Sequence, residues 1–120
     1  MVSILPCADP AERAALLEKN GVSDPAAMVL SAKEGGETTG RIAFILRESA
    51  IEFLCCDFGG DLALLDAMVR AAAAVAYRMG KTEAQSKAPA LYEPLSLVGF
   101  HKKDDRMSIE MSQLFKKCCG

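Results

Sequence analysis

The sequence lacks several features that would place it in a large class of proteins. Lysine and arginine total 14 against 16 acidic residues, for a net charge of −2, so there is no basic excess to indicate a nucleic-acid partner. No apolar run approaches the ~20 residues that a membrane-spanning helix needs. The first residues, MVSILPC, contain neither the charged segment nor the long apolar segment of a secretory signal. We therefore expect a cytoplasmic protein with no nucleic-acid or membrane partner.

Motifs for metal binding and for nucleophilic catalysis are also missing. The five cysteines form two adjacent pairs and one single residue, without a CxxC spacing. Neighbouring residues on a strand point to opposite faces, so Cys55 and Cys56 are not expected to share a metal or to form a disulfide with each other. His101, the only histidine, lies in a charged segment where we expect it to be exposed. These patterns predict free thiols in a reducing compartment and no metal site.

What the sequence does contain is an alternation of strand and helix patterns, which fits one domain spanning residues 1–120. Strands are expected over residues 2–5, 28–33, 38–46, 51–56, 82–87 and 107–111, and helices over 10–19, 61–79 and a short stretch from 89 to 92. The run IAFIL at 42–46 is apolar on both faces, which is typical of a central strand in a covered sheet. Pro94 is expected to interrupt the short helix, and residues 112–120 are expected to form a frayed tail.

The stretch FLCCDFGGDLALLDAMV, residues 53–69, joins a strand to a helix through two glycines. A glycine turn before a helix is the usual architecture of a phosphate site, because exposed backbone N–H groups and the helix dipole attract an anion. Asp61 stands at the start of this helix, where its carboxylate can act as an N-cap. Two interpretations are therefore open from the residues: a phosphate site, or a helix capped by its own aspartate.

The order of elements resembles that of the GNAT N-acetyltransferases, a family that transfers an acyl group from coenzyme A to an amine. The resemblance covers about residues 2–111, and the family's motif Q/R-x-x-G-x-G/A falls on FGGDLA at residues 58–63. Residues 85–100 are similar to a second family motif, N-x-x-A-x-x-L-Y-x-x-x-GF. The resemblance implies an α/β (α+β) fold, GNAT-like, in which helices flank a mixed, mostly antiparallel central sheet.

The resemblance also implies roles for residues of this chain. The strand before the turn would pair with the pantetheine arm of acetyl-CoA, and the turn would hold the pyrophosphate. The cofactor-binding residues implied in this way are Leu54, Cys55, Cys56, Phe58, Gly59, Gly60, Asp61, Leu62 and Ala63. Tyr92 falls on the family's frequent general acid, and Glu52, the only acid within residues 51–56, is the candidate base. A half-buried aromatic and a solvated glutamate are the structural alternatives for these two residues.

The chain departs from the family pattern at several points. Phe58 replaces a glutamine or arginine, and Asp61 replaces a glycine that lets the backbone approach the pyrophosphate. A carboxylate ~5 Å from a phosphate costs about 3 kcal/mol at an effective dielectric near 20. Tyr92 precedes Gly99 by seven residues, where the family usually has four, and a single helix stands where the family commonly has two.

Two functions are consistent with these observations. The first is an N-acyltransferase that moves an acetyl or acyl group from acyl-CoA to a small-molecule or protein amine. The second is a catalytically inactive GNAT-fold protein that binds a ligand or another protein, including a second copy in a homodimer. The fold does not decide between them.

Overall fold

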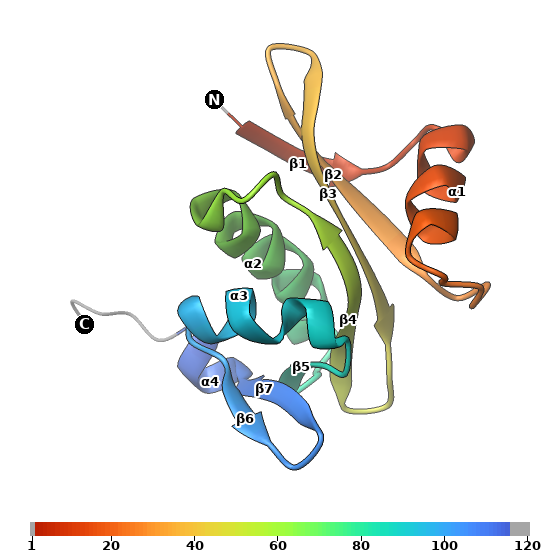
Figure 1. Cartoon of the computed structure of the whole chain (residues 1–120). Coiled ribbons are helices and arrows are strands. Elements are labelled where there is room, and N and C mark those ends of the chain that lie inside the picture. The colour runs from red at the N-terminus through yellow and green to blue at the C-terminus, as the bar shows by residue number, and fades with distance from the viewer. Residues whose placement is uncertain (1, 116–120) are drawn as a thin grey trace.

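A computed structural model describes residues 2–115 of the chain. Over these residues, seven strands form one sheet in the order β1-β2-β3-β4-β5-β7-β6 (Figure 1). The strands are β1 (Val2–Pro6), β2 (Met28–Glu34), β3 (Glu37–Leu46), β4 (Ala50–Asp57), β5 (Glu83–Ser86), β6 (His101–Lys103) and β7 (Arg106–Glu110). Only β4 and β5 are parallel; the other neighbours are antiparallel. This confirms the predicted mixed, mostly antiparallel sheet.

Helices cover both faces of the sheet. They are α1 (Pro10–Lys19), α2 (Leu62–Arg78), α3 (Tyr92–Leu97) and α4 (Met111–Leu114), with a 3-10 turn, η1, at Pro89–Leu91. Helix α1 covers one face, where Leu16 and Leu17 pack with Val29, Ala43 and Cys55. The other three helices lie on the opposite face, as Figure 1 shows. No helix within residues 2–115 has the length and apolar character that crossing a membrane requires.

Helix α2 contributes to the main core an apolar stripe whose residues are spaced three and four apart. The stripe consists of Leu64, Leu65, Met68, Val69, Ala72, Ala73 and Ala76, all buried. It packs on Phe44, Ile51 and Phe53 of the sheet, in the same cluster. Complete burial of a leucine, methionine or valine side chain contributes about 1.5–3 kcal/mol, so this contact is a large part of the stability of the fold.

Gly40 allows the first turns of α2 to lie close to β3. A Cβ atom at this position would be 2.8 Å from the carbonyl oxygen of Asp57 and 3.0 and 3.1 Å from side-chain atoms of Leu64 and Met68. Real Cβ atoms essentially never approach a neighbour below 3.0 Å. The contact below this limit is with the backbone of β4, so a side chain at position 40 would first push against β4, and then against the Leu64 and Met68 side chains that pack over the same place.

Two sequence-based expectations are wrong in the C-terminal part of the chain. Pro94 does not interrupt a helix but lies in the first turn of α3, where a backbone N–H is not needed for helical bonding. The frayed tail does not begin at residue 112, because α4 continues to Leu114 and buries that side chain. Residues 116–120, the rest of the expected tail, lie outside the described residues.

The Gly40→Ala variant should be less stable than the wild type by about 1–3 kcal/mol, because the added methyl group would lie too close to the Asp57 carbonyl of β4 and to the Leu64 and Met68 side chains of α2. Urea unfolding followed by circular dichroism measures the difference. Glu37→Ala, at an exposed position of the same strand, is the control and should change stability much less. Equal stability of the two variants would show that α2 does not require glycine at position 40.

Candidate functional site

The glycine turn after β4 has the form that its sequence predicts. The amide of Asp61 donates to the carbonyl of Phe58 at 2.9 Å. Between them, Gly59 and Gly60 have φ angles of 59° and 77°. Positive φ at both central positions is characteristic of a type I′ turn, which strongly favours glycine. The turn brings the backbone from the end of β4 directly into the N-terminus of α2.

Asp61 caps α2 with its own side chain. Its Oδ1 accepts a hydrogen bond from the amide of Leu64 at 3.1 Å, and its backbone carbonyl accepts from the amide of Leu65 at 3.0 Å. The carboxylate thus lies at the N-terminus of the helix, at the place where the family resemblance implies that the pyrophosphate of the cofactor binds. An N-cap aspartate stabilises a helix by roughly 1 kcal/mol, and its negative charge opposes the binding of a second anion.

The edge of β4 beside this turn has no strand partner in the described part of the chain. Strand β5 pairs only with Ala50, Ile51 and Glu52, whereas β4 continues to Asp57 along β3. Beyond Glu52 the two parallel strands separate, and the buried hydroxyl of Ser86 donates to the carbonyl of Phe53 at 2.8 Å. Residues 54–56 therefore present a free backbone edge at the stretch for which the family resemblance implies pantetheine binding.

Cys55 and Cys56 lie on opposite faces of the sheet, as predicted. Cys55 packs in the cluster under α1, and Cys56 packs against the cluster under α2. Both are free thiols. Burial raises the pKa of the Cys55 thiol from 9.0 to about 11. Burial also raises the pKa of Cys56, and the nearby Cys55 and Asp57 add to this increase. Neither side chain has the depressed pKa of a reactive cysteine.

Glu52 is the last residue of β4 that pairs with β5. The residue is only 9% exposed, and its Oε1 lies 3.2 Å from Nε of Arg47. The solvated glutamate considered from the sequence is therefore wrong. Ile51 and Phe53, which flank it, point into the cluster under α2, so the Glu52 side chain lies on the α1 side of the sheet, at the point where β4 and β5 separate.

Tyr92, at the start of α3, is bonded to the hairpin between β6 and β7. Its hydroxyl donates to the carbonyl of Asp105 at 2.7 Å, and Nζ of Lys102 lies 4.2 Å from the centre of its ring. These contacts attach α3 to the hairpin. Within residues 2–115 no hydrogen bond joins Tyr92 to Glu52, so the structure does not bring the two candidate catalytic groups into contact. His101, in β6, is exposed as expected.

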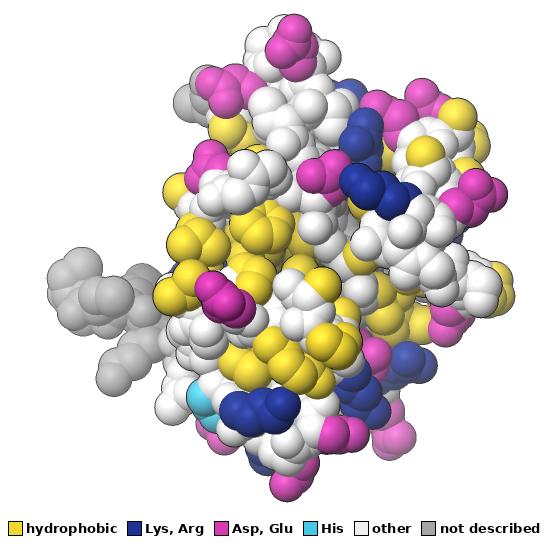
Figure 2. Space-filling model, in the orientation of Figure 1, with side chains coloured by type: hydrophobic (Ala, Val, Ile, Leu, Met, Phe, Trp, Pro, Cys, Tyr) yellow, Lys and Arg dark blue, Asp and Glu magenta, His cyan; other side chains and the backbone are white. Residues whose placement is uncertain are grey.

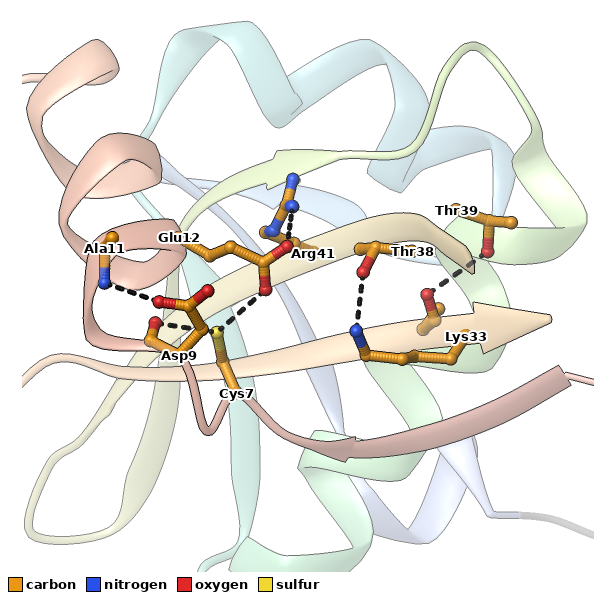
Figure 3. A network of polar contacts seen from close by, with 9 residues as sticks. Cys7, Asp9, Ala11, Glu12, Lys33, Thr38, Thr39 and Arg41 are labelled. Atoms are coloured by element: carbon orange, nitrogen blue, oxygen red, sulfur yellow. Dashed lines mark hydrogen bonds and ion pairs between the residues drawn. The ribbon is translucent and has the colours of Figure 1, made fainter. Parts of the chain in front are cut away.

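A polar network near β4 on the α1 side was not predicted from the sequence. Glu12 of α1 accepts from Nη2 of Arg41 at 2.7 Å, and the Cys7 thiol lies 3.9 Å from its other oxygen (Figure 3). Asp57, the last residue of β4, is paired with Arg41 on the neighbouring strand β3. A cavity of about 190 Å³ lies here, lined by Glu12, Ala15, Leu16, Lys19, Arg41 and Asp57. The two residues of this ion pair are 29 positions apart in the sequence. Their spacing therefore does not predict the contact.

A second cavity, of about 420 Å³, borders the glycine turn on the side of α2. It is lined by Val2, Glu34, Thr39, Phe58, Gly59, Asp61, Ala63, Leu64 and Ala67. Two of these side chains are carboxylates and none is a lysine or an arginine. The turn thus faces an environment that does not favour phosphate. A further cavity of about 570 Å³, which includes Tyr77 and Glu110, shares no residue with the predicted site.

Solved structures of acetyltransferases have a similar backbone. The IAA acetyltransferase from Bacillus cereus matches with a TM-score of 0.64 and 15% identity, over 92% of this chain and 100% of that chain. The N-acetylglutamate synthase from Neisseria gonorrhoeae, complexed with coenzyme A and N-acetyl-glutamate, matches with a TM-score of 0.71 and 15% identity, over 92% of this chain and 35% of that chain. A GNAT family acetyltransferase from Elizabethkingia anophelis with acetyl-CoA bound matches with a TM-score of 0.64 and 9% identity, over 92% of this chain and 98% of that chain.

No protein-family model matches the sequence, and the curated proteins contain no match to it. The structural matches, at these identities, show the fold alone. The chain has the fold of the GNAT superfamily, as its order of elements predicted.

Alkylation of Cys55 by iodoacetamide at pH 8 should be about a hundredfold slower in the folded protein than in the urea-unfolded protein. The reason is that a pKa near 11 leaves little thiolate at this pH. The rate in the folded state should rise about tenfold per pH unit up to the pKa. Mass spectrometry of the Cys55 peptide over time measures both rates, and rates within threefold of each other would contradict the burial of this thiol.

Proposed function

We propose that this GNAT-fold chain binds an acyl-coenzyme A through the pantetheine arm and transfers the acyl group to an amine. The observation that carries the proposal is the free backbone edge at residues 54–56, where β4 continues after β5 has ended. An extended arm with amide groups can pair with such an edge as an additional strand does. The solved neighbours with coenzyme A or acetyl-CoA bound support the proposal at the level of the fold.

The phosphates of the cofactor contribute little in this proposal. Asp61 already occupies the amide of Leu64, and the cavity beside the turn adds the carboxylate of Glu34. Each carboxylate repels a phosphate in a setting without a neighbouring lysine or arginine among the lining residues. The affinity for acyl-CoA therefore depends on the pantetheine arm, and we expect it to be weaker than in a site that also holds the pyrophosphate.

Acyl transfer needs a group that takes the proton of the amine when the new C–N bond forms and a group that protonates the departing thiolate. Glu52 is the proposed base, because its carboxylate lies where β4 and β5 separate and is held by Arg47. Tyr92 is the proposed acid. Its hydroxyl donates to the carbonyl of Asp105, and acid catalysis requires that it donate its proton to the departing sulfur instead.

A catalytically inactive GNAT-fold protein that binds a ligand or a protein is the second candidate function. The observation that favours it is that two groups of the implied site are engaged within the chain itself. The Asp61 carboxylate caps α2, and the Tyr92 hydroxyl is bonded to the hairpin. A protein that has kept the fold for binding needs neither group to be free.

The Asp61→Asn variant should bind coenzyme A about tenfold more tightly than the wild type, because the substitution removes a negative charge beside the phosphates. Asparagine is as good an N-cap as aspartate, so α2 should be preserved. Isothermal titration calorimetry at low salt measures both affinities. The control is Glu18→Gln, which makes the same charge change at an exposed position of α1. Equal gains in the two variants would show that Asp61 does not face the phosphates.

In the acyltransferase proposal, Glu52→Gln should lower turnover at least a hundredfold with little change in the Kd for acetyl-CoA. Arg47→Gln is the comparison variant, since it breaks the same ion pair but leaves the carboxylate, and it should lower turnover less than Glu52→Gln does. Tyr92→Phe should lower turnover more than cofactor affinity. The measurement is release of thiol from acetyl-CoA with a panel of amines. A wild type that binds acetyl-CoA but acylates no amine would favour the inactive candidate.

A further inference from the structure

The two outer edges of the sheet differ in length and in charge. At one end, β6 has three residues, HKK, which are all exposed. Figure 2 shows dark blue lysine and arginine side chains at the end of the molecule where β6 and β7 lie. Short edge strands and lysines are common means by which a sheet avoids pairing with another chain. At the other end, β1 has five residues, VSILP, and none of them is charged. The β1 edge lacks the features that protect the β6 edge.

The free backbone groups of β1 point away from the sheet. The amide of Cys7, which follows the strand, donates to the carbonyl of Val29 in β2 at 2.9 Å, and the register with β2 is regular over all five residues of β1. Because these directions alternate along a strand, the amides of Val2 and Ile4 point outward. Pro6, the next residue of this outward series, has no amide to leave unpaired. No strand within residues 2–115 pairs with this edge.

Apolar side chains accompany the free edge on both faces of the sheet. Ile4 packs against the cluster under α2, and Val2 lies on the same face because side chains two residues apart in a strand share a face. Leu5 lies on the other face. Val2 is 41% exposed and Leu5 is 56% exposed. A strand placed beside β1 would therefore cover apolar surface as well as backbone groups.

We propose that β1 pairs antiparallel with β1 of a second copy of this chain, which joins the two sheets into one. The edge is self-complementary about Ile4. When Ile4 lies opposite Ile4 of the second copy, all residues of the two strands overlap, and the two Ile4 residues exchange both backbone hydrogen bonds. Each Val2 amide then donates to the Pro6 carbonyl of the other copy. Proline removes one hydrogen bond at each end of the pair and leaves the central ones intact.

The side chains fit the same register. Leu5 lies opposite Ser3 of the second copy and diagonal to its Leu5, within reach of a long side chain. A pairing of two five-residue strands is small beside the ~1,200 Å² that a stable complex buries, so we expect a weak dimer that dissociates on dilution. The contact uses neither Glu52 nor Tyr92, and it is therefore independent of acyl transfer.

Sedimentation velocity of the reduced protein, from micromolar to millimolar concentration, measures the dimer. Over the same range, amide hydrogen exchange of Val2 and Ile4 should slow as the dimer forms, and exchange of Lys102 in β6 should not change. In a mixture of labelled and unlabelled protein, an intermolecular NOE should join the Hα atoms of Ser3 and Leu5, which approach closely across this strand pair. A protein that stays monomeric at millimolar concentration, or a dimer protected at other amides, would overturn the proposal.

Variants separate this edge from other exposed apolar positions. Leu5→Lys places like charges near each other across the strand pair and should weaken dimerisation about tenfold. Leu97→Lys is the matched control, because it makes the same substitution at a position that is 63% exposed in α3, and it should leave the dimer unchanged. Val2→Pro removes an outward amide without a change of charge and should also weaken the dimer. Circular dichroism checks that each variant is folded. Equal dimerisation of the two lysine variants would contradict pairing through β1.

Discussion

The contact between α2 and the sheet is the constraint on which the rest of the structure depends. The stripe around Met68 packs against the sheet core, and Gly40 allows the start of the helix to approach β3 closely. This contact fixes where α2 begins, and so fixes the turn that joins it to β4. The cap at Asp61 and the cavity beside the turn follow from the position of this one helix terminus, and the free edge of β4, which exists because β5 separates after Glu52, leads directly to it.

The helix terminus is where the chain keeps the frame of a phosphate site and changes its charge. The two glycines hold positive φ angles and the helix dipole is directed at the turn. The Asp61 carboxylate then satisfies an amide and adds a negative charge. A positive helix end that is neutralised from within the chain no longer favours an anion, whereas the pairing edge of β4 is unaffected because it depends on backbone groups alone.

The parts of the site that depend on neighbours in sequence could be predicted, and those that depend on distant residues could not. Asp61 caps an amide three residues away, and the glycine turn is set by two adjacent residues. In contrast, the Tyr92 hydroxyl bonds to Asp105, and Glu12 pairs with Arg41 across 29 positions. Pro94 was misjudged because a proline in the first turn of a helix has the same local sequence as one that ends it. The mixed, mostly antiparallel sheet was predicted from the family resemblance, whereas β6 (His101–Lys103) was not among the expected strands.

The most direct test of the claim that the pantetheine arm, and not the phosphates, provides the affinity is a comparison of acetyl-CoA with acetyl-pantetheine. Calorimetric titration of the reduced protein at low salt gives the two dissociation constants. We expect them to agree within about threefold, because the carboxylates of Asp61 and Glu34 offset the attraction of the helix end for phosphates. Binding of acetyl-CoA a hundredfold tighter than that of acetyl-pantetheine would contradict this claim and show that the turn is a working phosphate site.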